Sequence, residues 1–165
     1  ANIDACRAEN PNVTWKELHE RCGECPWPQP TGWQSPFCPN NLHRTMMQRV
    51  APYSLRGFLY YQGEEDVSRY EGYSDMMIAL VKQWRMDWND WSLPFLFVQL
   101  PMYLAIDTED DKKWAMQREQ QAIAAAMLKR VGMISMTDCG EFDNIHPLDK
   151  ETPGTRLALL AEQMV

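Results

Sequence analysis

The chain has 165 residues, a length typical of one domain, and 45% of them are hydrophobic, which excludes a disordered or fibrous protein. Its 16 Lys and Arg against 23 Asp and Glu give a net charge of -7, so no nucleic-acid partner is expected. The longest apolar stretch, Leu93 to Val98, is far shorter than the roughly 20 residues of a membrane-spanning helix, so no membrane association is expected.

Residues 1–40 are expected to form an appendage rich in Cys and Pro, followed by a domain over residues 41–165. Four of the five cysteines lie in this appendage, namely Cys6, Cys22, Cys25 and Cys38. They indicate two disulfides in an exported protein, a zinc site or redox pair built on Cys22 and Cys25, or free structural thiols. Disulfides favour an extracellular or periplasmic location, with the cytoplasm as the alternative. Trp27 and Trp33 are candidates for stacking on a sugar ring.

Beyond the appendage, apolar residues predict one helix and then three strand-and-helix units. Leu42, Met46 and Val50 recur at helical spacing before Pro52. Apolar runs predict strands at 55–61, 93–100 and 131–137. The helices between them are marked by Met77, Val81 and Trp84, and by residues 114–129 with Ile123 and Met127 facing inward. The last helix is expected to use Thr152 as its N-cap and Pro153 as its first residue.

Strands this apolar, alternating with helices, predict an α/β fold in which a doubly wound parallel sheet is covered on both faces, giving three layers. Ligands of such sheets bind beyond the carboxyl ends of the strands. Two polar segments follow predicted strands, at residues 62–66 and residues 138–146. We therefore expect the functional site to draw on both.

The second segment carries a histidine with a carboxylate three residues before it. Asp143 is placed to accept the Nδ1–H of His146, which would leave Nε2 free to take a proton. An ordinary loop contact is the alternative for this pair. His19 and His43 are expected to be surface or structural residues.

The first segment offers an amide and several carboxylates. Gln62 is a candidate hydrogen-bond donor to an oxyanion, and Gly63 would allow close approach of the backbone; a simple strand-ending turn is the alternative. Glu64, Glu65 and Asp66 fit an acid/base pair or an oxygen-ligand metal site, but a solvated acidic loop is favoured.

The motifs taken together resemble a known family. Residues 51–64, which end in Gln62-Gly63-Glu64, resemble the strand leading into the Gln-Gly-Glu motif of sialate O-acetylesterases, which are carbohydrate esterases of the SGNH hydrolase superfamily. Residues 94–100 resemble the next strand of that family. Asp143, His146 and Pro147, followed by Lys150 and residues 156–159, resemble its closing catalytic block and final helix. The resemblance covers residues 40–165.

The resemblance implies a flavodoxin-like SGNH fold and an esterase that removes O-acetyl groups from sialic acids or other acetylated sugars, without a metal or organic cofactor. His146 would be the general base, Asp143 its orienting partner, and Gln62, Gly63 and Glu64 the oxyanion and substrate-binding segment. The chain contains no Gly-Gln-Ser-Asn block, which carries the nucleophile in that family. Ser35 follows a glutamine as in that block, but Pro36 comes directly after it and no apolar strand precedes it. The serine and the first strands are therefore expected on a missing N-terminal segment or a companion chain.

Two other functions remain open from the sequence. One is a carbohydrate-binding or interaction module that has lost the nucleophile and uses Trp27, Trp33 and the acidic loop as contacts. The other is a redox or metal-binding module centred on Cys22 and Cys25.

Overall fold

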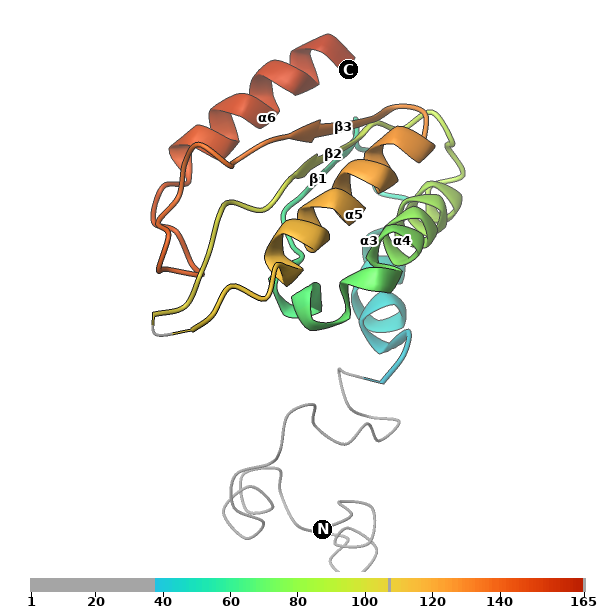
Figure 1. Ribbon diagram of the computed structural model, residues 1–165. Helices are drawn as coiled ribbons and strands as arrows, with labels where there is room; N and C mark the ends of the chain where they lie inside the picture. The colour runs from blue at the N-terminus through green and yellow to red at the C-terminus, as the bar shows by residue number, and fades with distance from the viewer. Residues whose placement is uncertain (1–37, 107, 165) are drawn as a thin grey trace, which may run out of the picture. The chain divides into compact units, whose positions relative to one another are not determined.

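The computed structural model describes residues 38–106 and 108–164 (Figure 1). The predictions for Cys6, Cys22, Cys25, Trp27, Trp33, Ser35 and His19 lie outside these residues. The chain divides into two compact units, Ala1–Ala51 and Pro52–Val165, and each is described by itself. The predicted appendage over residues 1–40 stays a prediction.

The described part of the first unit is helical. A π-helical segment, η1 (His43–Met47), continues directly into α3 (Gln48–Val50). Ala51 then turns to an extended conformation, with ψ of 135°, as expected for a residue that precedes proline. The predicted helix before Pro52 is thus confirmed.

The second unit is built on a parallel three-stranded sheet with the strand order β1-β2-β3. The strands are β1 (Phe58–Tyr60), β2 (Phe95–Val98) and β3 (Val131–Ile134). Phe58 lies opposite Phe95, which in turn lies opposite Val131. Each strand falls inside a predicted apolar run but is shorter than that run.

Helices cover both faces of the sheet, which confirms the α/β fold with three layers (Figure 1). A 3-10 helix, η2 (Glu64–Gly72), leads into α4 (Tyr73–Asp87), which packs with α5 (Lys113–Met127) on one face. The final helix, α6 (Glu151–Met164), packs on the other face. All four residues of β2 are buried, because β2 is the central strand between two helical layers.

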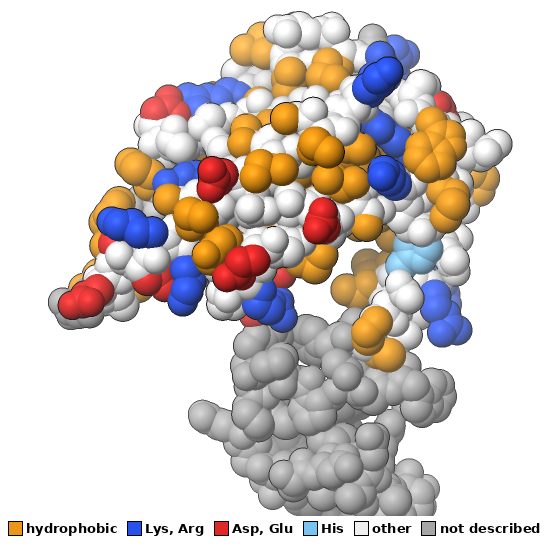
Figure 2. Space-filling view, turned by 45° about the vertical axis from the view of Figure 1, so that its right-hand side comes forward, with side chains coloured by type: hydrophobic (Ala, Val, Ile, Leu, Met, Phe, Trp, Pro, Cys, Tyr) orange, Lys and Arg blue, Asp and Glu red, His pale blue; other side chains and the backbone are white. Residues whose placement is uncertain are grey.

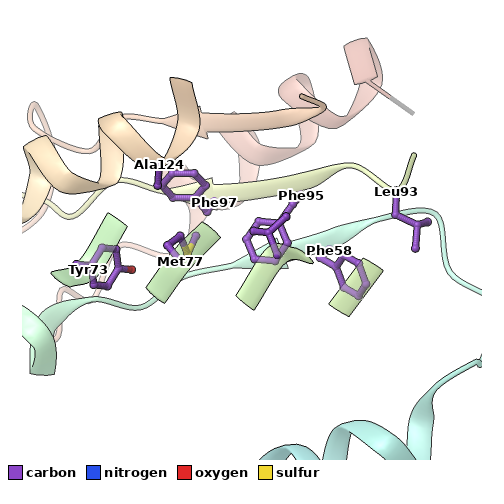
Figure 3. Packing of buried hydrophobic residues seen from close by; sticks show 8 residues of the cluster. Phe58, Tyr73, Met77, Leu93, Phe95, Phe97 and Ala124 are labelled. Carbon is purple, nitrogen blue, oxygen red and sulfur yellow. The ribbon is translucent and has the colours of Figure 1, made fainter. Parts of the chain in front are cut away.

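The larger core lies between the sheet and the pair α4 and α5. Phe58, Phe95 and Phe97 extend from the strands towards Met77 and Val81 of α4. Figure 3 shows Tyr73 and Ala124 at one end of this row and Leu93 at the other. The aromatic rings make tilted contacts, with 5.9 Å between the centroids of Phe58 and Phe95. Tyr73 therefore marks the end of the core nearest the carboxyl ends of the strands.

The inward face of α5 differs from the prediction. Ile123 and Met127 are 40% and 69% exposed, and the buried residues of this helix are Gln117, Gln121 and Ala124. The expectation that Ile123 and Met127 face inward is therefore wrong. Gln121 takes an inward position because its amide bonds to backbone groups of Leu100 and Val98 at the end of the sheet, whereas the amide of Gln117 has no hydrogen-bond partner among the described residues.

The start of α6 also differs from the prediction. Thr152 lies inside the helix rather than at its N-cap, and the Thr152 N–H donates a 3.0 Å hydrogen bond to Asp149 Oδ1. The Asp149 side chain therefore caps the helix. Later in α6, Leu160 and Met164 pack so closely on Gly132 of β3 that a Cβ there would lie 2.8 Å and 2.9 Å from their side chains. None of the described helices has the length and apolar character needed to cross a lipid bilayer.

Candidate functional site

The loops that follow the three strands gather at one edge of the sheet, because parallel strands end on the same side (Figure 1). The Leu104 N–H, in the loop after β2, donates a 2.9 Å hydrogen bond to the carbonyl of Phe142, in the loop after β3. The Lys150 ammonium, near the end of that second loop, lies 5.1 Å from the centre of the Tyr61 ring, just after β1. Both predicted segments therefore lie along this edge.

Two hydrogen bonds orient the side chain of Gln62. The Tyr60 hydroxyl donates to Gln62 Oε1 over 3.0 Å, and Gln62 Nε2 donates to Asp66 Oδ2 over 2.8 Å. Burial, together with the nearby carboxylates of Asp66 and Glu64, raises the pKa of Tyr60 to about 12, so its hydroxyl stays a donor at neutral pH. The amide is therefore fixed in direction, and one N–H of Nε2 has no acceptor among the described residues.

A small cavity lies beside the Gln62 amide. Its volume is about 190 Å³, and its lining includes Tyr60, Gln62 and Asp66 on one side and Tyr73 and Met76 of α4 on the other. Pockets that bury drug-sized ligands measure roughly 300–1,000 Å³, so this cavity has room for a small group rather than a whole sugar. The described cavity by itself therefore has the size of a small chemical group.

Gly63 occupies a position that strongly favours glycine. Its φ is 149°, and an added Cβ would lie 3.1 Å from the side-chain nitrogens of both Gln117 and Gln121. Glu64 follows as the first residue of η2, so the predicted acidic loop is the first turn of a helix, where negative charge is favoured. Burial first, and the Glu64 charge second, raise the pKa of Tyr61.

Asp143 and His146 lie in the loop after β3, and both are exposed. No hydrogen bond joins their side chains in the structure. The His146 N–H donates instead to Asn144 Oδ1 over 3.0 Å, which fixes the backbone at this position. The predicted pairing of Asp143 with His146 therefore stays a prediction.

Glu141 organises the histidine loop, which the sequence analysis did not predict. Its Oε1 accepts a 2.9 Å hydrogen bond from the Leu148 N–H, and its Oε2 accepts one of 2.6 Å from Asn144 Nδ2. These bonds, with the Leu148 N–H first, lower the pKa of Glu141. Glu141 and Asn144 together close the loop around His146. The only sequence signal was the polar run after Gly140, which did not distinguish these residues from their neighbours.

An ion pair anchors the beginning of the same loop to α6. Arg156 Nη1 and Nη2 each lie 2.7 Å from one oxygen of the Asp138 carboxylate. The Arg156 hydrogen bonds, followed by that of Cys139, hold the pKa of Asp138 well below its usual range. Within residues 38–106 and 108–164, no group of three or more His, Cys, Asp or Glu residues is arranged to hold a metal ion.

Charged side chains of both signs are interspersed among apolar ones on the described surface that Figure 2 presents. A surface with such mixed charge does not set up the strong field of one sign that steers a highly charged polymer. Within the part of the chain that the structure describes, the carboxyl edge of the sheet carries an oriented amide, a histidine loop and a small cavity, which makes it the candidate site.

Comparison with known proteins gives consistent results. Residues 29–164 match the family model described as carbohydrate esterase, sialic acid-specific acetylesterase. The sialate O-acetylesterase of Rattus norvegicus is 28% identical over 134 residues, and that of Mus musculus is 27% identical over 135 residues. Each match covers 72% of this chain and 25% of the relative.

A solved structure is similar as well. A carbohydrate acetylesterase from Xanthomonas citri matches with a TM-score of 0.69 and 33% sequence identity, over 74% of this chain and 29% of that protein. The chain thus spans between a quarter and a third of the length of the proteins it resembles.

Proposed function

Because this chain belongs to the sialic acid-specific acetylesterase family of carbohydrate esterases, we propose that it supplies part of the active site of an enzyme that removes O-acetyl groups from sialic acid or another acetylated sugar. The observation that carries the proposal is the Gln62 amide. Tyr60 and Asp66 hold it in one orientation at the carboxyl edge of the sheet, with one N–H left for an oxyanion.

His146 acts as the general base in this proposal. Its Nε2 takes the proton of a serine hydroxyl as the serine oxygen attacks the acetyl carbonyl, and Asp143 orients the imidazole and stabilises its charged form. The proton then passes to the sugar oxygen as the carbon–oxygen ester bond breaks. Water activated by the same imidazole hydrolyses the acetyl-enzyme and releases acetate.

Gln62 stabilises the negative charge that develops on the acetyl oxygen. A donor held in place before the reaction needs no reorganisation when the charge forms, and donors of this kind contribute about 10²–10³ in kcat. The missing side chain of Gly63 lets this segment pack against the buried amides of Gln117 and Gln121, and Glu64 lies at the border of the same segment. No metal or organic cofactor takes part in this scheme.

The nucleophilic serine belongs to a further segment of the polypeptide or to a companion chain. The outer edge of β1 has no partner strand among the described residues, and Leu59 of this strand is 64% exposed. A groove of about 550 Å³ runs beside it, lined by Phe58, Leu59 and Leu96 of the sheet and by Ala158 and Ala161 of α6. Parallel sheets are normally covered on both faces, which supports packing of additional apolar structure at this edge.

A location outside the cytoplasm, in the extracellular space or the periplasm, is part of the proposal. It rests on the crowding of Cys6, Cys22, Cys25 and Cys38, which suits an oxidising compartment.

The test measures acetate release from O-acetylated sialic acid by the natural polypeptide that carries this sequence. The Gln62→Ala variant should lose about 10²–10³ in kcat. Gln83→Ala is the matched control, because Gln83 bonds only to Asp87 on α4 and should leave kcat unchanged. Binding of the sugar without acetate release, or equal kcat in the Gln62 and Gln83 variants, would contradict the proposal.

A further inference from the structure

We propose that Gln121, a buried residue of α5, is a positioning residue for the oxyanion site, because it holds the peptide group between Gln62 and Gly63 in one orientation. This inference rests on the function proposed above and goes further. It assigns the backbone N–H of Gly63 as a second donor to the oxyanion, in addition to the Gln62 side chain.

The Gln121 side chain connects the loops that follow two strands. It is 0% exposed, and its Oε1 accepts a 3.0 Å hydrogen bond from the Leu100 N–H, just beyond β2. Its Nε2 donates to the carbonyl oxygens of Gln62 and Val98 over 3.3 Å and 3.4 Å. One amide therefore ties the backbone after β1 to the backbone at the end of β2.

A second side chain holds the same carbonyl. The Tyr73 hydroxyl, from the first residue of α4, donates a 3.0 Å hydrogen bond to the Gln62 carbonyl oxygen. In a planar trans peptide the C=O of one residue and the N–H of the next point in opposite directions. Because Gln121 and Tyr73 draw the Gln62 oxygen towards themselves, the Gly63 N–H faces away from both of them.

The Gly63 N–H has no hydrogen-bond partner among the described residues, although Gly63 is buried. Buried N–H groups without a partner are rare in native proteins, because each one costs free energy. An oxyanion that forms on the substrate would supply the partner, in the way that backbone N–H groups serve other acyl-transfer enzymes. The Gly63 N–H is therefore a donor that is oriented before the reaction and left without a partner among the described residues.

Gln117 provides a matched comparison within the same helix. It lies one turn before Gln121, is also 0% exposed, and also contacts the position where a Gly63 side chain would be. Its side-chain nitrogen and oxygen have no hydrogen-bond partner among the described residues, however. Replacing either glutamine by Met removes a buried amide of the same size, but only at Gln121 does this release the Gln62 carbonyl.

The experiment compares Gln121→Met, Gln117→Met and Tyr73→Phe in the natural polypeptide. The readouts are kcat and KM for an acetyl ester, with kcat expressed per serine titrated by a fluorophosphonate, so that misfolded protein is not counted. Gln121→Met should lower kcat per titrated site at least about tenfold with little change in KM. The reason is that the Gly63 N–H, which Gln121 orients, contacts the oxyanion only in the transition state. Tyr73→Phe should lower kcat in the same direction, and Gln117→Met should leave it unchanged.

The double variant Gln121→Met with Tyr73→Phe should lose less than the product of the single losses, because both side chains act on one carbonyl. Equal kcat per site in Gln121→Met and Gln117→Met would overturn the inference, while a loss in Gln62→Ala would still support the proposed function. No acetate release by the unmodified polypeptide would overturn both. If Gln121→Met does not fold, Tyr73→Phe decides the matter: unchanged kcat per site in that variant would overturn the inference.

Discussion

The Lys150 ammonium lies 5.1 Å from the centre of the Tyr61 ring. Tyr61 directly precedes Gln62, and Lys150 follows His146 in the loop after β3, so this contact joins the two segments that carry the candidate site. A cation over an aromatic face at an exposed position contributes roughly 0.5–1 kcal/mol. The relationship is therefore weak in energy but informative about how the site is assembled.

A double-mutant cycle on Tyr61→Leu and Lys150→Met measures that contact. We expect a coupling free energy of about 0.5–1 kcal/mol in thermal or urea unfolding of the natural polypeptide. Lys129→Met, combined with Tyr61→Leu, serves as the control pair and should show no coupling. A coupling free energy near zero for Lys150 would mean that the loop and the end of β1 are held together by other contacts.

Replacement of Gly63 by alanine should be costly. The φ of 149° disfavours any L side chain, and the new Cβ would press on two buried amides. We expect a loss of about 1–3 kcal/mol in the free energy of unfolding, together with a loss of acetate release. Gly154→Ala in α6 is the control, because nothing lies within 4 Å of the added Cβ.

The control should be more stable than the unmodified protein by about 0.5–1 kcal/mol, since alanine favours a helix interior over glycine. Equal unfolding curves for the Gly63 and Gly154 variants would contradict the described conformation of Gly63.

Arg85 should contribute to stability through backbone contacts at the opposite end of the sheet. It is 4% exposed and donates hydrogen bonds to the carbonyls of Leu93, Lys129 and Arg130. Arg85→Met removes the side-chain donor to all three carbonyls, of which that of Arg130 still accepts from the Phe95 N–H, and should lower the free energy of unfolding by about 2–4 kcal/mol. Arg49→Met, at an exposed position of α3, should change it by less than about 0.5 kcal/mol. A similar change in both variants in a urea titration would rule out this role.

The histidine loop should open in acid. The Glu141 carboxylate accepts hydrogen bonds from Leu148 and Asn144, and these bonds lower its pKa below the ordinary value of 4.5. A carboxyl with a lowered folded-state pKa stabilises the fold above its unfolded pKa, and this contribution is lost as the pH falls through the folded value. We therefore expect residues 141–148 to lose protection below pH 4.5.

Hydrogen exchange, normalised to the unstructured peptide at each pH, is the measurement. Glu141→Gln should show weaker protection near neutral pH and little dependence on acid. The same acid-induced loss in this variant would assign the effect to another carboxyl group.

The sheet could be predicted from the sequence, because the runs at 55–61, 93–100 and 131–137 are short, apolar and separated by helical patterns, as in a parallel sheet covered by helices. The inward face of α5 could not be predicted from the sequence. Hydropathy favoured Ile123 and Met127, whereas the structure places Gln117 and Gln121 inside. Gln121 meets unpaired backbone groups at a strand end, and this need for a polar partner is invisible in the periodicity of apolar residues.

The candidate site likewise contains residues that the sequence indicated and residues that only the structure shows. Gln62 and Gly63 were indicated by their position after an apolar run, and the structure places them at the carboxyl edge of the sheet. Gln121 acts on Gln62 from 59 positions away in the chain, so only the fold shows its contact. Glu141 and Asn144 are close to His146 in sequence, but their hydrogen bonds depend on the course of the loop.

Acetate release from O-acetylated sialic acid by the natural polypeptide and its His146→Ala variant tests the central claim most directly. His43→Ala, which removes a histidine from η1, is the control. We predict that His146→Ala lowers kcat by about 10²–10⁴-fold while His43→Ala stays within about twofold of the unmodified protein. Equal rates in the two variants would contradict the assignment of His146 as the general base, and with it the proposed esterase mechanism.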